Sequence, residues 1–139
     1  MPVLYLIRGL PGSGKTTHAK KLAASIGCIH LEADMLCCSD GQYKWSKELQ
    51  PLRHQKLLAV ATIVMLVNAD IVVSNVFSKK EELKAFIDEA IFCGYQIKVI
   101  KCYKSFGTVH GVPESTIADM AARWEDFDGE ELVNYGDLL

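Results

Sequence analysis

The residues best suited to chemistry lie near the N-terminus, in the stretch Gly9-Leu10-Pro11-Gly12-Ser13-Gly14-Lys15-Thr16. This stretch matches the whole pattern G-x-x-x-x-G-K-[S/T] of a phosphate-binding loop, or P-loop. Glycines let the backbone bend around an anion, so that successive N–H groups point at phosphate oxygens. Lys15 would place a positive charge at the β- and γ-phosphates, and Thr16 would offer its hydroxyl to magnesium. The motif therefore predicts a site for ATP with magnesium, and the residues expected to bind the nucleotide are Gly9, Pro11, Gly12, Ser13, Gly14, Lys15, Thr16 and Thr17.

The segments on either side of the P-loop are those that the motif requires. Residues 3–7 form a continuous apolar run, which is typical of a strand buried on both faces of a parallel sheet. After Lys15, apolar residues recur at helical spacing as far as Ile26, and Gly27 follows as a stop signal. A glycine-rich turn without a ligand is the alternative interpretation. The order of strand, loop and helix disfavours that alternative.

Strand-like and helix-like segments alternate along the rest of the chain. Strands are expected over residues 28–31, 71–73 and 95–100, and helices over residues 52–68, from a Ser78-x-x-Glu81 capping box to residue 93, and from Pro113 to Trp124. This alternation predicts an α/β fold, a three-layer sandwich with a mainly parallel sheet of about four to five strands, as in P-loop nucleoside triphosphate hydrolases and kinases. The helix over residues 52–68 is apolar nearly all round and is expected to be mostly buried. The strand over residues 95–100 alternates polar and apolar residues and is expected nearer an edge.

The chain of 139 residues is long enough for one compact domain, which we expect to cover residues 1–139. Within it, residues 32–51 are expected to form a polar substrate-side loop and residues 103–113 a lid-like loop. Residues 127–139 are an acidic tail without a clear pattern. Ligands of parallel sheets bind at the carboxyl ends of the strands, where the P-loop and Asp34 are both expected.

Composition and charge exclude several classes of protein. The content of 50 % hydrophobic and 23 % charged residues is that of a globular protein rather than a disordered one. No apolar run approaches the roughly 18 to 20 residues that span a bilayer, and no export signal is recognisable, so we expect a cytoplasmic protein without a membrane partner. The net charge of -2 lacks the basic excess of proteins that bind nucleic acid through many phosphates. The scattered cysteines and histidines show no zinc-site spacing.

Segments beyond the P-loop carry a family resemblance. They are Ala33-Asp34-Met35, Gly41 to Trp45 with His54 downstream, Ser74 to Phe77, His110 to Pro113, and Arg123 to Glu125. With them, nearly the whole chain resembles the ATP-binding proteins related to polynucleotide 5′-hydroxyl kinases and to the P-loop domain of the BCL3/NEDD4-binding proteins, an AAA-type ATP-binding family of phage and bacteria. In the kinases of this group, an aspartate after the second strand accepts the proton of the attacking hydroxyl, so the resemblance implies that Asp34 is the catalytic base. The alternatives for Asp34 are a helix cap or a magnesium ligand that acts through water.

Two departures from the family pattern concern the charge around the phosphates. Many relatives have a second acidic residue after the third strand, where this chain has Ser74 and Asn75. Relatives often carry a lid arginine, which residues 106–110 lack. The difference matters because such an arginine can raise the rate of phosphoryl transfer on the order of 10³-fold. Arg123 matches another arginine of the relatives and is the candidate replacement. A surface ion pair with Glu125 is the alternative for Arg123.

Further residues are candidates for contact with the substrate, namely Arg8, Tyr43, His54, Asn75 and His110. Most have a structural alternative. Arg8 could be paired within the fold, Tyr43 could anchor its loop to the core, and His110 could fix a turn. The assignment of His54 depends on the family match alone, and Asn75 would support magnesium in place of the missing acid.

Together these residues predict a kinase that transfers the γ-phosphate of ATP to a hydroxyl, with Lys15, Asp34 and Arg123 as catalytic residues. The acceptor stays open between the 5′ end of a nucleic acid, a nucleoside or nucleotide, and another small molecule, a sugar nucleotide included. The alternative is an ATP-binding regulatory module with little or no turnover, which the missing lid arginine favours. A GTPase is disfavoured because the chain contains no Asn-Lys-x-Asp. The oligomeric state is left open.

Overall fold

A five-stranded parallel sheet forms the centre of the protein. The computed structural model describes residues 1–36, 47–103 and 112–133. The strands lie in the order β2-β3-β1-β4-β5, and each neighbouring pair is parallel. Their bounds are β1 Val3–Arg8, β2 Ile29–Glu32, β3 Ile71–Asn75, β4 Gln96–Cys102 and β5 Glu131–Val133. The prediction of an α/β fold with a mainly parallel sheet is confirmed.

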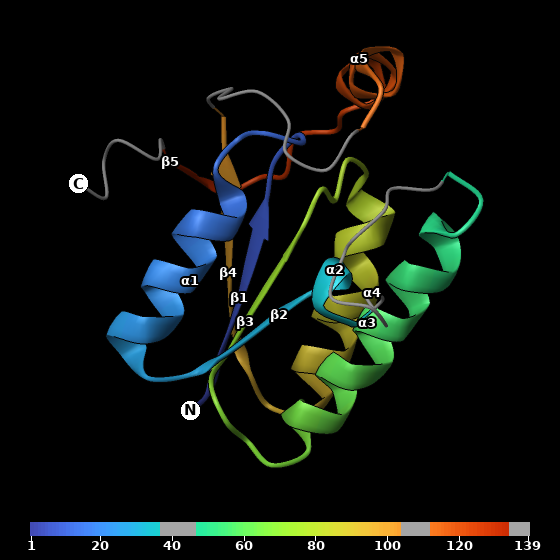
Figure 1. Ribbon diagram of the computed structural model, residues 1–139. Helices are drawn as coiled ribbons and strands as arrows, with labels where there is room; N and C mark the ends of the chain where they lie inside the picture. Colours follow the sequence, from blue (N-terminus) through green and yellow to red (C-terminus); the bar gives the residue numbers. More distant parts are fainter. Residues whose placement is uncertain (37–46, 104–111, 134–139) are drawn as a thin grey trace.

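Helices cover the sheet in the arrangement of a three-layer sandwich. Their bounds are α1 Lys15–Ile26, α2 Ala33–Leu36, α3 Gln50–Met65, α4 Lys80–Phe92 and α5 Glu114–Ala122. Helix α1 packs on one face of the sheet, α3 and α4 pack on the other, and α5 lies beyond the ends of the strands (Figure 1). No helix within the described ranges is long and apolar enough to cross a membrane.

Strand β1 is buried on both of its faces. Leu4 and Leu6 are fully buried in the core beneath α3 and α4, whereas Ile7 is fully buried in the core beneath α1. The continuous apolar run of residues 3–7 predicts such two-sided burial. The P-loop follows β1 directly, so the packing of β1 on both faces holds the first residue of the P-loop in place.

The edge of the sheet beside β4 differs from the sequence prediction. Residues Glu131–Val133 lie in the expected tail without pattern, yet they form β5 and pair with Ile100 to Cys102 of β4. The strand that was expected nearer an edge is therefore second from the edge. Its polar residues Gln96 and Lys98 are exposed, because β5 covers only the last part of β4.

The expectation that the apolar helix α3 is mostly buried is wrong. Leu57, Ala61 and Met65 are fully buried against the sheet. In contrast, Ile63 within the helix is 65 % exposed, and Val67, just beyond its end, is 72 % exposed. Helix α3 belongs to an outer layer, so only one of its sides meets the sheet. Apolar residues all round a helix therefore did not predict burial all round it.

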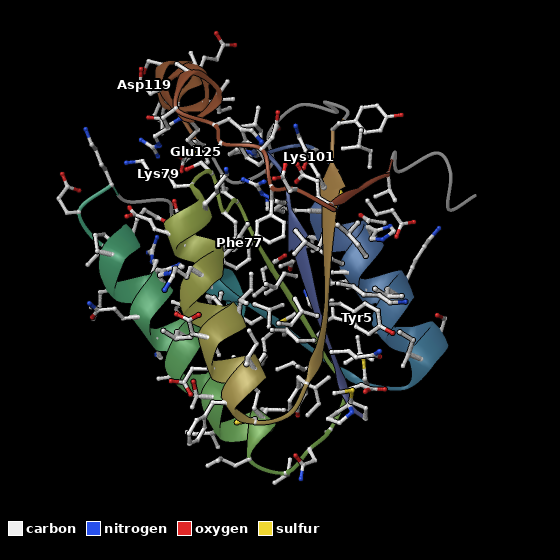
Figure 2. All side chains as sticks on the ribbon, turned by 180° about the vertical axis from the view of Figure 1, so that it is seen from behind. Tyr5, Phe77, Lys79, Lys101, Asp119 and Glu125 are labelled. Carbon is white, nitrogen blue, oxygen red and sulfur yellow. The ribbon has the colours of Figure 1, made fainter. Side chains whose placement is uncertain are left out.

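The start of α4 is stabilised by a distant part of the chain instead of the expected capping box. The helix begins at Lys80, and the Ser78 hydroxyl donates to the Glu82 carboxylate at 3.2 Å. The backbone N–H of Lys80 donates to Glu125 Oε1 at 2.9 Å. Figure 2 shows Lys79 and Glu125 at the same end of the molecule. An acidic side chain is favourable here because the N-terminal end of a helix is its positive end.

The two loops predicted around the site are only partly described. In the range 32–51, Glu32 ends β2, Ala33–Leu36 form α2 and Gln50 begins α3, so this range is less irregular than expected. In the lid-like range 103–113, the structure describes residues 103, 112 and 113.

Candidate functional site

The P-loop and the start of α1 form a cradle of backbone groups. Gly14 is the N-cap of α1 with a φ of 84°, and Gly12 has a φ of 83°. Both angles lie in the left-handed region, which glycine adopts without steric cost. The N–H groups of the first turn of α1 point toward the loop, and Gly14 has no side chain that could cap them. This geometry is that of an anion site at a helix N-terminus.

Close packing holds the base of the P-loop against β4. A Cβ atom on Gly9 would lie 2.2 Å from Ser13 Oγ and 2.9 Å from the carbonyl oxygen of Cys102, so glycine is required there. Ser13 is 3 % exposed, and its Oγ has no hydrogen-bond partner in the part of the chain that the structure describes. A buried hydroxyl in this state retains capacity for a further partner.

The charge of Lys15 acts on the end of β4, beside the P-loop. Burial raises the pKa of the Cys102 thiol to about 11, and the positive charge of Lys15 opposes that rise. Cys102 is therefore a neutral thiol near pH 7, unsuited to act as a nucleophile. The charge of Lys15 therefore acts close to the base of the P-loop, the position at which the motif expects it to meet phosphate.

A buried set of hydrogen bonds lies behind Thr16, and we call Thr16, His30, Glu32 and Ser74 the Glu32 cluster. Thr16 Oγ1 donates to Glu32 Oε1 at 2.6 Å, and Ser74 Oγ donates to the same oxygen at 2.7 Å. His30 Nε2 lies 2.7 Å from Ser74 Oγ. Because the single hydrogen of Ser74 is directed to Glu32, His30 Nε2 must be the donor to Ser74, which fixes the tautomer of the histidine.

Strand register brings the Glu32 cluster together. Glu32 and Ser74 are partners at the ends of β2 and β3, and α1 packs against both strands. Glu32 and Ser74 are 6 % and 0 % exposed, so hydroxyl groups take the place of water around the carboxylate. Glu32 was not among the predicted site residues, although it lies in the range 32–51 that was expected to form the substrate-side loop. The available signal was an acidic residue directly after an apolar strand.

Oxygen donors of this kind suit magnesium. Mg²⁺ is commonly bound through one or two protein oxygens together with phosphate oxygens and water. The Thr16 hydroxyl, with the Glu32 carboxylate behind it, fits this requirement. Over residues 1–36, 47–103 and 112–133, no three His, Cys, Asp or Glu side chains gather into an all-protein metal site. The described residues therefore fit a magnesium ion that is bound together with phosphate.

Arg8, a candidate substrate residue, is fully buried in a second set of contacts. We call Arg8, Phe77, Trp124, Glu125 and Glu130 the Arg8 cluster. The Arg8 Nε and Nη2 atoms donate to the Phe77 carbonyl at 3.1 Å and 2.6 Å, and Nη2 also donates to the Glu125 carbonyl at 2.7 Å. Nη1 forms an ion pair with Glu130 at 3.0 Å, and the guanidinium carbon lies 4.2 Å from the centroid of the Trp124 ring. Arg8 is thus an arginine paired within the fold, and its interpretation as a substrate residue is corrected.

His54, a second candidate substrate residue, packs among aromatic rings. Its ring lies edge-on to Phe77 and Phe86, with centroid distances of 6.0 Å and 5.6 Å. Burial lowers the pKa of His54, while the charge of Glu82 acts in the opposite direction. The imidazole is therefore in its neutral form near pH 7 and packs as an aromatic ring. This arrangement indicates a packing role for His54.

Arg123, the candidate replacement for a lid arginine, stands at the end of α5. Its Nε donates to Ser78 Oγ at 3.3 Å, at the start of α4, and its side chain is otherwise exposed. This contact joins α5 to α4 through the segment that also provides Glu125 as the cap of α4. The described geometry thus gives Arg123 a role in joining the two helices.

The other candidates are described only in part. Asp34 lies in α2, directly after β2, at the carboxyl end of the sheet. Its side chain is outside the described structure, and so are the whole of Tyr43 and His110. Asn75 ends β3 and is the register partner of Arg8 in β1. Asp34 and Asn75 therefore lie at the end of the sheet that carries the P-loop.

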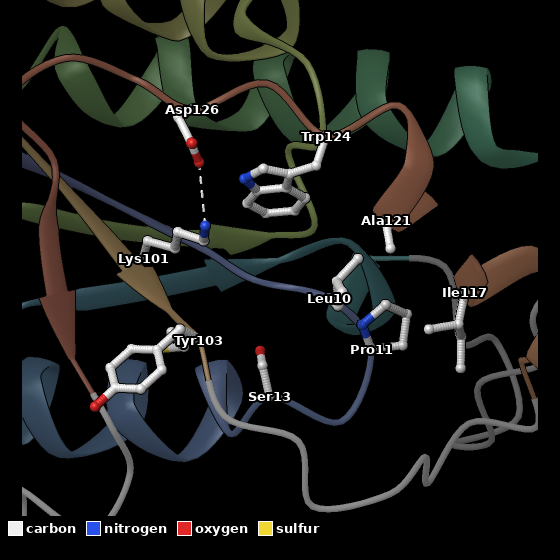
Figure 3. A pocket seen from close by; sticks show the side chains of 10 residues that line it. Leu10, Pro11, Ser13, Lys101, Tyr103, Ile117, Ala121, Trp124 and Asp126 are labelled. Atoms are coloured by element: carbon white, nitrogen blue, oxygen red, sulfur yellow. Dashed lines mark hydrogen bonds and ion pairs between the residues drawn. The ribbon is translucent and has the colours of Figure 1, made fainter. Parts of the chain in front are cut away.

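A pocket of about 440 Å³ lies between the P-loop and α5 (Figure 3). Small-molecule sites commonly have volumes of about 300 to 1,000 Å³. Lys101 Nζ lies 3.1 Å from Asp126 Oδ1, and the hydrogen bond from Lys101 lowers the pKa of Asp126. The lining residues are Leu10, Pro11, Ser13, Lys101, Cys102, Tyr103, Ile117, Ala121, Trp124 and Asp126. The pocket thus has the size of a ligand site, and Leu10, Pro11 and Ser13 of the P-loop form part of its wall.

Comparisons with known proteins agree with a P-loop fold. A model of the AAA domain family matches residues 4–109. The structure is similar to Chaetomium thermophilum Kti12 in complex with ADP-AlF3, with a TM-score of 0.74, 18 % identity, and coverage of 96 % of this chain and 90 % of that chain. It is also similar to Mycobacterium tuberculosis APS kinase CysC in complex with AMPPNP and APS, with a TM-score of 0.62, 15 % identity, and coverage of 94 % and 86 %.

A third similar structure is a candidate kinase from Chloroflexus aurantiacus, with a TM-score of 0.62, 19 % identity and coverage of 73 % of this chain. The match spans 58 % of the length of that protein. At these identities the likeness shows the fold and not the activity. The predicted fold of P-loop nucleoside triphosphate hydrolases and kinases is confirmed.

Proposed function

The chain belongs to the AAA domain family, and on that premise we propose that it transfers the γ-phosphate of ATP to a hydroxyl group. The observation that carries this proposal is the complete P-loop at the start of α1, with Thr16 hydrogen-bonded to a buried carboxylate. In phosphoryl transfer the protein mainly positions the reactants and neutralises charge. Backbone N–H groups, the ammonium group of Lys15 and the oxygen of Thr16 are the groups that this requires.

The proposal assigns a residue of this chain to each step of the reaction. Lys15 and the P-loop N–H groups bind the β- and γ-phosphates, and Thr16 holds magnesium, which neutralises phosphate charge when bound. The acceptor oxygen forms a bond to the γ-phosphorus while the bond between phosphorus and the β–γ bridging oxygen breaks, and ADP leaves. Asp34, placed directly after β2, accepts the proton of the hydroxyl.

The acceptor in this proposal is the 5′-hydroxyl of a nucleic-acid end, or a hydroxyl of a nucleoside or nucleotide. The resemblance to polynucleotide 5′-hydroxyl kinases supports it, and the similar Mycobacterium tuberculosis enzyme binds both AMPPNP and APS. The net charge of -2 favours contact with a single end over contact with a long tract of phosphates. The proposal places the reaction in the cytoplasm and within one domain over residues 1–139.

An ATP-binding regulatory module with little or no turnover is the second candidate, and the arginines favour it. The arginines of the chain are Arg8, Arg53 and Arg123. Arg8 and Arg53 are 0 % and 7 % exposed, and Arg123 donates to Ser78. An arginine on the transition-state charge would then come from a rearrangement of this chain or from a partner protein. Without it, ATP would be held and transfer would be slow.

A transfer assay distinguishes these two functions. The purified protein is incubated with γ-labelled ATP and magnesium against 5′-hydroxyl DNA and RNA, nucleosides, nucleoside monophosphates, and buffer alone. We expect label on one acceptor, and no label with Lys15→Ala or Asp34→Ala, whereas Asp88→Asn on the exposed side of α4 serves as a matched control. ATP binding without transfer to any acceptor would favour the regulatory module. Undiminished transfer by Asp34→Ala would eliminate Asp34 as the base.

A further inference from the structure

We infer that Glu32 is a positioning residue for magnesium, and that it acts through the hydroxyl of Thr16. The inference rests on the proposed function, because it concerns the metal bound with ATP. The observation behind it is the 2.6 Å hydrogen bond that Thr16 Oγ1 donates to Glu32 Oε1, and Glu32 is 6 % exposed. The P-loop motif assigns a role to Thr16 but none to Glu32.

The direction of the Thr16 hydrogen decides whether its oxygen can serve a cation. A threonine hydroxyl has one hydrogen and two lone pairs. For a lone pair to face a metal, the hydrogen must point elsewhere and find an acceptor there. Glu32 is that acceptor, on the side of β2, so the lone pairs of Thr16 stay available on the side of the P-loop. A hydrogen bond to a carboxylate also polarises the hydroxyl and increases the negative charge on its oxygen.

Ser74 and His30 hold the Glu32 carboxylate in this position. Ser74 Oγ donates to Glu32 Oε1 at 2.7 Å, and His30 Nε2 lies 2.7 Å from Ser74 Oγ. His30 therefore donates to Ser74, and Ser74 and Thr16 both donate to Glu32. Ser74 donates from β3, and the carboxylate that accepts comes from β2, the neighbouring strand.

The negative charge of Glu32 should have opposite effects on the binding of ATP with and without magnesium. A negative charge behind the P-loop repels the triphosphate when magnesium is absent and attracts the cation when it is present. Removal of that charge should weaken the binding of magnesium–ATP without weakening the binding of metal-free ATP. A residue that merely packs between strands would weaken both, because its loss would distort the P-loop in either case.

Calorimetric titration of the whole chain with ATP, with and without magnesium, tests this inference. Glu32→Gln keeps the shape of the side chain and removes its charge, and Asp88→Asn removes a charge from an exposed ion pair with Lys84 on α4. We expect the gain in ATP affinity on adding magnesium to fall about 10- to 100-fold in Glu32→Gln, the range found for groups that orient metal ligands. Metal-free ATP should bind at least as tightly as it binds to the wild type, and Asp88→Asn should match the wild type.

A second variant keeps the inference testable if Glu32→Gln does not fold. Thr16→Val removes the hydroxyl and leaves Glu32 bonded to Ser74, and it should lose the magnesium gain as well. Where both single variants fold, the loss in the double variant should be smaller than the sum of the two single losses, because part of the effect of Glu32 passes through the Thr16 hydroxyl. A full magnesium gain in either single variant, additive losses in the double variant, or weaker metal-free binding in Glu32→Gln would each overturn the inference. Transfer activity is a separate readout, since magnesium-dependent binding without transfer would sustain this inference and defeat the proposed kinase.

Discussion

The two buried clusters at the carboxyl end of the sheet use their charges in opposite ways. In the Arg8 cluster, the guanidinium group donates to the carbonyls of Phe77 and Glu125 and pairs with Glu130, so its donors point into the protein. In the Glu32 cluster, Thr16 and Ser74 donate their hydrogens to the carboxylate, so the Thr16 oxygen keeps its lone pairs for a further partner. Burial of a charged group therefore does not by itself mark a site. The capacity that remains after the internal partners are satisfied is the better guide.

The largest effect should come from opening the Arg8 cluster. Arg8→Ala leaves the Glu130 carboxylate, whose side chain is 7 % exposed, without its ion-pair partner. Removing one member of a buried ion pair costs about 3–5 kcal/mol, so the free energy of unfolding should fall by about that amount in urea denaturation. Arg123→Ala is the control, since it removes one contact of an exposed arginine. A similar loss of unfolding free energy in both variants would contradict the prediction that the buried ion pair of Arg8 stabilises the fold more than an exposed arginine does.

Lys15→Ala should affect catalysis and leave the Arg8 cluster intact. Loss of a preorganised charged group at the reacting phosphates is expected to lower the transfer rate by about 10²- to 10³-fold. Urea denaturation should show a smaller loss of stability than that of Arg8→Ala. Lys84→Ala removes a lysine that is 74 % exposed on α4 and should transfer phosphate at the wild-type rate. Equal loss of transfer in the two variants would contradict a specific role for Lys15.

Ser74→Ala should weaken the Glu32 cluster by an intermediate amount. It removes one donor to Glu32 and the acceptor of His30 Nε2, inside a fully buried site. A buried polar group left without its partner costs about 1–3 kcal/mol, which thermal or urea unfolding can measure. Ser25→Ala, on an exposed turn of α1, serves as the control and should stay close to the wild type. No difference between the two serine variants would show that the cluster does not stabilise the fold.

The smallest effect concerns His54, which packs against Phe77 of the Arg8 cluster. Burial lowers the pKa of His54 below its ordinary value of 6.5, so near and below that pH the unfolded chain binds a proton that the folded chain resists. Stability should therefore fall as the pH drops from about 7 toward 5, and His54→Phe should flatten that fall. Part of the fall should persist, because burial also lowers the pKa of His18. An unchanged pH dependence of the unfolding free energy in His54→Phe would contradict the assigned cause.

Local sequence patterns predicted the parts of the molecule that depend on neighbours in sequence. The P-loop, the strand before it and the helix after it follow from glycine positions and apolar spacing within residues 3–27. Strand β5 was not assigned because it has three residues, too few to show a period. The exposed side of α3 was missed because its apolar residues show no clear period, although the predicted three-layer sandwich places helices in the outer layers.

The contacts that decide the site join residues that are far apart in sequence. Glu32 and Ser74 are separated by 42 positions and meet only through strand register. Arg8 and Glu130 are separated by 122 positions. Nothing in the sequence around Arg8 distinguishes an arginine that binds phosphate from one that binds carbonyl groups. The charge of Arg8 was therefore known from the sequence, but its partners were not.

The Arg8 cluster also bears on how a newly made chain acquires its shape. A ribosome adds about 5–20 residues per second, so on the order of 10 seconds separate the synthesis of Arg8 from that of Glu130. During that interval the end of β1 lacks the carboxylate and the Glu125 carbonyl that later anchor it. The end of β1, which leads into the P-loop, therefore gains these contacts only after residues 125–130 have been made.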